Sequence, residues 1–165
     1  MMAAPATTIS LSLNKGLCAP NGALLVGPRD VIARALVVRQ QLGGGIRPSG
    51  AIAAAGLVAL QTMLPQLQRD HDNAQALATG LGAIGFVATP QLGGTNIVLV
   101  DLELPRAWLD GFLAALATHG VLAIAFGPGR LRLCLHRGIE ADDLPAIIAA
   151  FEAAGASIGV SQQEN

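Results

Sequence analysis

The sequence predicts an α/β fold, and three observations support this class. Strand-like and helix-like patterns alternate along the second half of the chain. The first segment is typical of two short strands around a loop rich in glycine and proline. Of the 165 residues, 52% are hydrophobic and only 13% are charged, which excludes general disorder and supplies enough apolar surface for a core.

Two short aliphatic segments near the start, residues 7–13 and 23–26, are expected to be strands. The loop between them carries three turn residues: Gly16, Pro20 and Gly22. At best these two strands make a two-stranded ribbon, which is marginally stable alone. Such strands normally belong to a larger sheet, and the sequence supplies no further strand before them, so we expect the chain to be part of a larger protein.

Two helices are expected next. The first runs from Pro28 to about Gln41, because proline is favoured in the first turn of a helix and the three glycines at 43–45 end it. The second begins near Pro48 or Ser49, and its residues 51–60 are apolar on nearly every side. A helix without a polar face is expected to be buried, either in a core or against another subunit.

After Pro65, amphipathic helices alternate with strands. The helix that follows is expected to turn Leu67, Ala74, Leu77 and Leu81 inward, and Arg69, Asp70 and Asp72 to solvent. Strands are predicted at 96–102, 121–125 and 130–135, helices at 107–118 and 141–154, and a frayed tail at 160–165.

The composition excludes several classes of function. The net charge is −1, the pI is near 6.3 and aromatic residues make up 3%, which argues against nucleic-acid binding. Two scattered cysteines and three scattered histidines predict neither a disulfide framework nor a metal site. The most apolar stretch falls far short of the ~20 residues that span a membrane, and the N-terminus lacks a basic signal-peptide region. We therefore expect a soluble, cytoplasmic protein.

Lys15 is the first candidate for chemistry, because it is the only lysine among ten basic residues. It directly follows the first expected strand and precedes a glycine in an apolar stretch of sequence. Apolar surroundings lower the pKa of a lysine amine, and a neutral amine can hold an aldehyde cofactor as a Schiff base. The alternative is an ordinary surface lysine.

Two arginines are candidates for binding an anion. Arg47 follows the glycines at 43–45, whose amides can face an anion, although the same run also fits a plain connector between helices. Arg132 alternates with leucines on the strand at 130–135, so its guanidinium suits a carboxylate unless that face is merely solvated. Structural or surface roles are favoured for the remaining candidates: Cys18, Cys134, His71 and His136.

Four segments, taken in order, carry a resemblance to a known family: ISLSLNKGLCAPNGALLVG, RDVIARA, LGGGIRPSGAIAAAG and RDHDNA. Together they resemble the low-specificity L-threonine aldolases of the aromatic amino acid β-eliminating lyase/threonine aldolase family. The resemblance covers nearly the whole chain and corresponds to the C-terminal half of such an enzyme. It implies the aspartate-aminotransferase-like fold (fold type I) of pyridoxal-phosphate enzymes. Residues 1–45 would be a remnant of the cofactor-binding large domain, and residues 46–165 would form interface helices and a small α+β domain.

The resemblance also implies roles for three residues. Lys15 falls on the lysine that holds pyridoxal 5′-phosphate as a Schiff base, and Arg132 falls on the arginine that binds the substrate α-carboxylate. Arg47 falls on an arginine that reaches the cofactor region of the neighbouring subunit. The implied reaction is cleavage of L-threonine or L-allo-threonine to glycine and acetaldehyde by a homo-oligomer.

Some positions depart from the family pattern. Asn14 stands where serine is usual, Cys18 replaces a glycine, and Pro48 replaces a glutamine. Only 14 residues precede Lys15, whereas the family's phosphate cup and ring-binding residues lie many residues before the lysine. The isolated chain is therefore expected to be inactive or barely active. The alternatives are a non-catalytic relic, a subunit of a split enzyme that needs an N-terminal partner chain, and a pyridoxal-phosphate β-eliminating lyase that acts on another amino acid.

Overall fold

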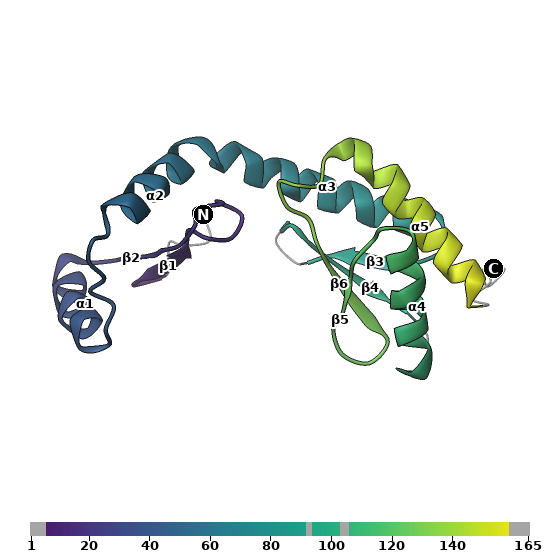
Figure 1. Ribbon diagram of the computed structural model, residues 1–165, viewed down its shortest axis with the longest axis horizontal. Coiled ribbons are helices and arrows are strands. Elements are labelled where there is room, and N and C mark those ends of the chain that lie inside the picture. Colours follow the sequence, from purple (N-terminus) through teal and green to yellow (C-terminus); the bar gives the residue numbers. More distant parts are fainter. Residues whose placement is uncertain (1–5, 92–93, 103–105, 159–165) are drawn as a thin grey trace. The chain divides into compact units, whose positions relative to one another are not determined.

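The computed structural model describes residues 6–91, 94–102 and 106–158, and it has the predicted α/β class (Figure 1). The chain divides into two compact units, one up to Gln66 and one from Leu67 onwards. Each unit is considered by itself.

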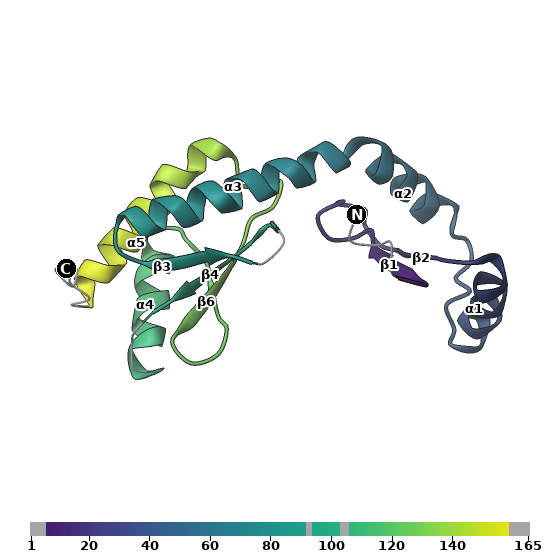
Figure 2. The same ribbon diagram turned by 180° about the vertical axis from the view of Figure 1, so that it is seen from behind.

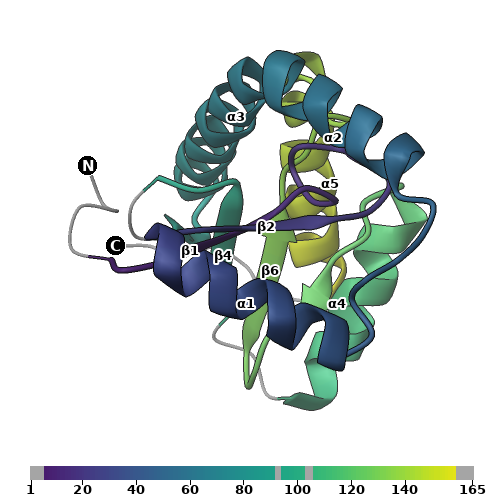
Figure 3. The same ribbon diagram turned by 90° about the vertical axis from the view of Figure 1, so that its left-hand side faces the viewer.

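The first unit contains two strands and two helices in the predicted positions. Strands β1 (Ile9–Ser12) and β2 (Ala23–Val26) pair antiparallel, with Ile9 opposite Val26. Helix α1 (Arg29–Gln41) follows β2 and lies alongside it (Figure 3). Helix α2 (Gly50–Thr62) comes next. The two strands form a sheet of their own within the described residues, which is the two-stranded ribbon expected from the sequence.

Helix α2 is less buried than its apolar sequence predicts. Only Gly56 and Ala59 of this helix are buried, whereas Leu57 and Val58 are 60% and 57% exposed. Helix α1 has no buried residue at all. Because apolar helix faces of this kind are normally covered, both helices present surfaces suited to association.

The end of α1 is a Schellman motif. Gly43 takes a left-handed conformation with φ +77°, and its amide donates to the carbonyl of Gln40. The amide of Gly44 donates to the carbonyl of Arg39 at 2.8 Å. Two of the three consecutive glycine amides therefore cap the helix, which supports the connector interpretation of this run and leaves those two amides committed.

The second unit is a four-stranded antiparallel sheet with helices (Figure 2). The order of strands across the sheet is β3, β4, β6, β5. The elements are α3 (Leu64–Ala83, from Leu67 on within this unit), β3 (Val87–Pro90), β4 (Ile97–Asp101), α4 (Arg106–Thr118), β5 (Ile124–Ala125), β6 (Arg130–Cys134), a 3-10 turn (Ala141–Asp143) and α5 (Leu144–Ser157).

The core of this unit lies between one face of the sheet and helices α3, α4 and α5. Alternate residues of β4 and β6 face it and are almost fully buried: Val98, Val100, Leu131 and Leu133. Three phenylalanines pack at its centre, where the ring centroid of Phe151 lies 5.4 Å from that of Phe86 and 5.7 Å from that of Phe112. Strict alternation thus leaves the opposite face of the sheet free of the helices.

Three details differ from the sequence-based expectations. Strand β3 was not predicted, and β5 is shorter than the predicted strand at 121–125. Asp70 was expected on the solvent side but is only 1% exposed. It precedes Ala74 by four residues and Leu77 by seven, so helical geometry places it on the buried stripe. The predicted tail at 160–165 lies outside the described residues.

Two glycines of α3 offer a matched test of packing between helices. A methyl group added at Gly80 would collide with the side chain of Ile148 on α5, whereas one added at Gly82 would meet nothing. Gly82→Ala is expected to raise the free energy of unfolding by up to ~1 kcal/mol, because alanine is the better helix former. Gly80→Ala is expected to lower it by about 1 kcal/mol, since overpacking outweighs that gain. Urea unfolding monitored by circular dichroism measures both, and equal effects at the two positions would contradict the close packing of α3 and α5.

Within the described ranges, no single helix is long and apolar enough to cross a membrane. Only the consecutive helices α2 and α3, taken together as a bent pair, would meet that test of length and hydropathy.

Candidate active site

The loop between β1 and β2 presents Lys15 on a well-anchored backbone. The amide of Cys18 donates to the carbonyl of Lys15 at 2.8 Å, and the amide of Ala19 donates to the carbonyl of Leu13 at 2.9 Å. Leu13, Leu17 and Ala19 are buried, while Lys15 is exposed. The apolar setting that the sequence predicted is therefore formed by neighbouring residues of the loop and does not enclose the lysine side chain. No side chain in the described ranges pairs with the Lys15 amine, which leaves it free to react.

Helix α2 fixes this loop by a close approach. A Cβ atom at the buried Gly56 would lie 3.1 Å from Cδ1 of Leu13, and one at Gly22 would lie 3.3 Å from the same atom. The Leu13 side chain is thus held between two glycines, one on α2 and one at the end of the loop. Because Leu13 lies two residues before Lys15, this contact holds the start of the Lys15 loop in place.

Cys18 has a strained backbone. Its φ of +58° lies in the left-handed region, and it is the single non-glycine residue with positive φ among the described residues. Its thiol contacts the carbonyl of Gly16 at 3.6 Å. The resemblance places a glycine at this position, and the backbone explains why, because glycine adopts this conformation without a steric penalty.

Cys18→Gly is accordingly expected to stabilise the loop by about 1 kcal/mol. The measurement is hydrogen exchange of the Leu13 and Ala19 amides, which the loop protects. Cys18→Ala is the matched control, since it removes the thiol but keeps the strained side-chain position. An equal gain with alanine would assign the effect to the thiol and contradict the backbone explanation.

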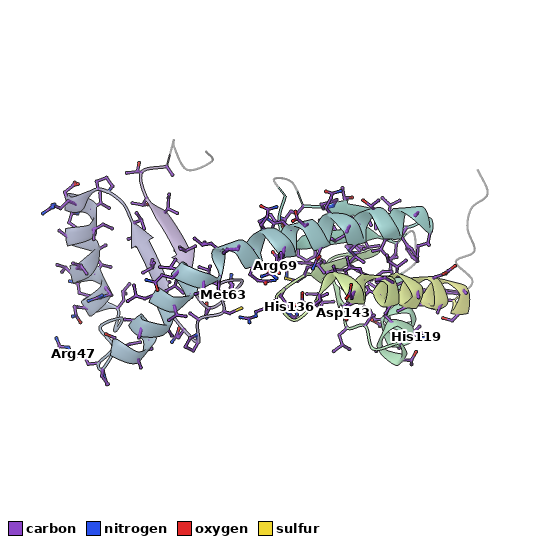
Figure 4. All side chains as sticks on the ribbon, turned by 90° about the horizontal axis from the view of Figure 1, so that it is seen from above. Arg47, Met63, Arg69, His119, His136 and Asp143 are labelled. Carbon is purple, nitrogen blue, oxygen red and sulfur yellow. The ribbon has the colours of Figure 1, made fainter. Side chains whose placement is uncertain are left out.

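A polar hollow of about 620 Å³ adjoins the Lys15 loop within the first unit. None of the residues that line it is acidic; the polar ones include Ser12, Asn14, Asn21, Arg39, Arg47 and Ser49. Arg47 is exposed and projects outward from the segment between α1 and α2 (Figure 4). The guanidiniums of Arg39 and Arg47 are not paired with any described side chain. The hollow therefore carries two free positive charges and suits an anion.

Arg132 lies on β6, on the face of the sheet that the helices leave free. It sits opposite Leu99 of β4 and Ile124 of β5, and its side chain is half-buried. No described side chain pairs with its guanidinium. Arg132 is therefore a single cation between aliphatic neighbours, which is an arrangement suited to bidentate binding of a carboxylate.

The end of β6 that follows Arg132 is held by Asn96. The Asn96 amide nitrogen donates to the carbonyl of Leu135 at 2.6 Å and contacts Sγ of Cys134 at 3.3 Å. In return, the Leu135 amide donates to the Asn96 carbonyl. Sequence reasoning missed Asn96, because nothing in its local pattern distinguishes it from an ordinary loop asparagine.

The remaining sequence candidates are Cys18, Cys134, His71 and His136. Cys18 and Cys134 are both free and exposed, one in each unit. His136 follows β6, and its Nδ1 accepts a hydrogen bond from the amide of Gly138 at 3.0 Å. His71 is half-buried on α3, and the third histidine, His119, lies just past α4 (Figure 4). The described residues contain no group of three potential metal ligands. Lys15 and Arg47 thus belong to the first unit, and Arg132 to the second.

Comparison with solved structures defines the class of fold. The chain matches a serine palmitoyltransferase from Sphingomonas wittichii with a TM-score of 0.75 at 22% identity, over 93% of this chain and 40% of that one. A serine palmitoyltransferase from S. paucimobilis, solved with bound PLP–myriocin, matches with a TM-score of 0.74 at 22% identity, over 93% and 41%. The chain therefore has the α/β fold of the C-terminal portion of fold type I enzymes.

The family follows from sequence. The profile of the Beta-eliminating lyase family matches residues 1–105, and the chain belongs to this family. It is similar to the low specificity L-threonine aldolase of Escherichia coli (strain K12), at 49% identity over 88% of this chain and 42% of the relative. It is also similar to low-specificity L-threonine aldolase 1 of Arabidopsis thaliana, at 36% identity over 90% and 42%. The chain thus spans about two-fifths of the length of these relatives.

Proposed function

We propose that this chain is the C-terminal part of a pyridoxal-phosphate-dependent aldolase that cleaves L-threonine or L-allo-threonine to glycine and acetaldehyde. The observation that carries the proposal is Lys15, the only lysine of the chain, exposed on an anchored loop with an amine that no described side chain pairs with. Two relatives that are named low-specificity L-threonine aldolase support the choice of substrate. We assign residues 1–45 to the cofactor-binding domain, and residues 46–165 to interface helices and the small domain.

The residues of the first unit fit this cofactor. An aldehyde needs a free primary amine, which Lys15 provides, and a phosphate needs a cation, which Arg39 brings to the adjoining hollow. The absence of acidic residues from the lining of that hollow agrees with an anionic ligand. When bound, pyridoxal phosphate supplies an electron-withdrawing ring that stabilises negative charge at the substrate Cα.

The protein's own residues would bind, orient and move protons. Lys15 would hold the cofactor covalently and, once released, its amine would be placed to accept or donate a proton. Arg132 would bind the substrate α-carboxylate through a bidentate contact, and thereby fix which bond at Cα is broken. Arg47 would neutralise an anion in the cofactor region of a neighbouring subunit, and the exposed apolar faces of α1 and α2 agree with a homo-oligomer or with an N-terminal partner chain.

Two other functions are kept as candidates. The name of the family itself favours β-elimination on an amino acid. Aldol cleavage of threonine releases acetaldehyde, whereas β-elimination releases ammonia, so assays of the two products separate them. A non-catalytic role in folding or association is the third candidate, and cofactor binding at Lys15 distinguishes it from both enzymes.

The decisive experiment uses the single lysine. The chain is mixed with pyridoxal phosphate, reduced with borohydride and mapped by peptide mass. We expect saturable labelling of Lys15 at micromolar cofactor, an absorbance band of the imine before reduction, and loss of both in Lys15→Arg. Labelling confined to the N-terminal amine, or labelling only at millimolar cofactor, would overturn the assignment of Lys15.

Activity is tested in a hybrid enzyme, in which this chain replaces the matching C-terminal segment of the Escherichia coli aldolase. We expect the hybrid to release acetaldehyde from threonine and to lose that activity in Lys15→Arg. An inactive hybrid that still binds cofactor at Lys15 would favour the lyase candidate.

A further inference from the structure

Two arginines on the helix-free face of the sheet differ in their pairing. Arg130 and Arg132 lie two residues apart on β6, so both side chains project from the same face and their Cα atoms are roughly 7 Å apart. In the proposed function, only Arg132 has a role. The cross-strand neighbours of the two guanidiniums explain why Arg130 is paired with an acid and Arg132 is not paired with any described side chain.

Arg130 is neutralised by an acid directly across the sheet. Asp101 of β4 lies opposite Arg130 in the register, and its Oδ1 accepts a hydrogen bond from Nε of Arg130 at 2.5 Å. Their side chains are 38% and 43% exposed, respectively, so both stay accessible to a ligand. The hydrogen bond and charge of Asp101 raise the pKa of Arg130.

Arg132 has no such acid. Its cross-strand neighbours, Leu99 and Ile124, are aliphatic, and no described side chain pairs with it. Over the described part of this face, one guanidinium is thus free and the next is balanced by a carboxylate. A second negative charge on a ligand at Arg132 would find Arg130 already paired with the carboxylate of Asp101.

We propose that Asp101 is a specificity-determining residue: it neutralises Arg130, leaves Arg132 as the one carboxylate-binding group, and so selects β-hydroxy amino acids with a single carboxylate over those with two. The inference rests on the proposed function, since it assumes that Arg132 binds the substrate carboxylate. Selectivity then comes from repulsion of the second carboxylate as well as from attraction of the first.

Binding by the full chain tests this without catalysis. Acetate and succinate, which carry one and two carboxylates, are titrated while the arginine Nε–H signals are followed by NMR. The Asp101→Asn variant is expected to bind succinate ~10-fold more tightly than the parent chain, because Arg130 becomes free to pair with the second carboxylate. Its affinity for acetate is expected to be unchanged. Adding Arg130→Gln is expected to remove that gain. An unchanged affinity for succinate, an equal gain for acetate, or a gain that survives Arg130→Gln would overturn the proposal.

Selectivity is measured in the hybrid enzyme with threonine and 3-hydroxyaspartate. In the second substrate the Cα–Cβ bond breaks, the β-hydroxyl loses its proton to give the aldehyde of glyoxylate, and Cα gains a proton to give glycine. Asp101→Asn is expected to raise the ratio of kcat/KM for 3-hydroxyaspartate to that for threonine ~10-fold. Asp110→Asn, which removes an exposed charge on α4, is the control and should leave the ratio unchanged.

The two hypotheses fail in different ways. A hybrid that does not cleave threonine would refute the proposed function, and the succinate titration would still decide whether Asp101 controls binding of a second carboxylate. A hybrid that cleaves threonine but keeps its selectivity in Asp101→Asn would refute the role of Asp101 alone.

Discussion

Phe151→Ala is expected to lower the free energy of unfolding of the second unit by about 3–5 kcal/mol. Phe151 is fully buried on α5 and packs edge-on against Phe86 and Phe112. Its removal would leave a cavity at the point where α4, α5 and the sheet meet, and would also remove two aromatic contacts. Urea unfolding followed by the fluorescence of Trp108, the only tryptophan of the chain, reports on this unit because Trp108 lies on α4.

Phe126→Ala is the matched control for that prediction. Phe126 is 52% exposed and lies outside the core, so its truncation is expected to change the free energy of unfolding by at most ~0.5 kcal/mol. Comparable losses in the two variants would mean that the three phenylalanines do not form the centre of the core.

Arg132→Ala should lower kcat/KM of the hybrid enzyme for threonine by about 10²-fold or more, because a carboxylate loses its charged partner. Labelling of Lys15 by pyridoxal phosphate should persist, since Arg132 lies on the sheet of the other unit. Arg132→Lys is expected to recover only part of the loss, because lysine keeps the charge but lacks the planar fork.

Arg69→Ala, which removes an exposed guanidinium on α3, is the control for a general effect of charge and should leave kcat/KM within about two-fold of the parent. A loss of Lys15 labelling in Arg132→Ala, or full activity in that variant, would contradict the role of Arg132 in binding the substrate.

The periodicity of the sequence predicted most of the fold. The alternation of leucine with Arg130, Arg132 and Cys134 placed the strand and both of its faces correctly, because a period of two is unambiguous on a half-covered sheet. The C-terminal end of α1 was also predicted correctly, from the glycines at 43–45. Strand β3 was missed because Val87–Pro90 is only four residues long and ends in a proline, which is disfavoured inside a strand.

Candidate site residues were harder to predict than helices and strands. Lys15 was found because it is unique, and its sequence context then suggested a buried amine, whereas the buried apolar residues are those on either side of it along the loop. Asp101 and Asn96 carried no signal, because their significance depends on partners 29 and 39 residues further along the chain, on β6 or just past its end. Asp70 was assigned to the solvent side because it is charged, although its spacing from Ala74 and Leu77 places it on the buried side of α3.

The strand order of the second unit has a consequence for how the chain folds. Strands β3 and β4 are consecutive in sequence, as are β5 and β6, whereas the central pair, β4 with β6, is separated by α4 and β5. Closing a long loop costs more entropy than closing a short one, so the two outer pairs are expected to form early and the central pair last. Since Trp108 lies on the connecting helix, its fluorescence should change when the two halves of the sheet join.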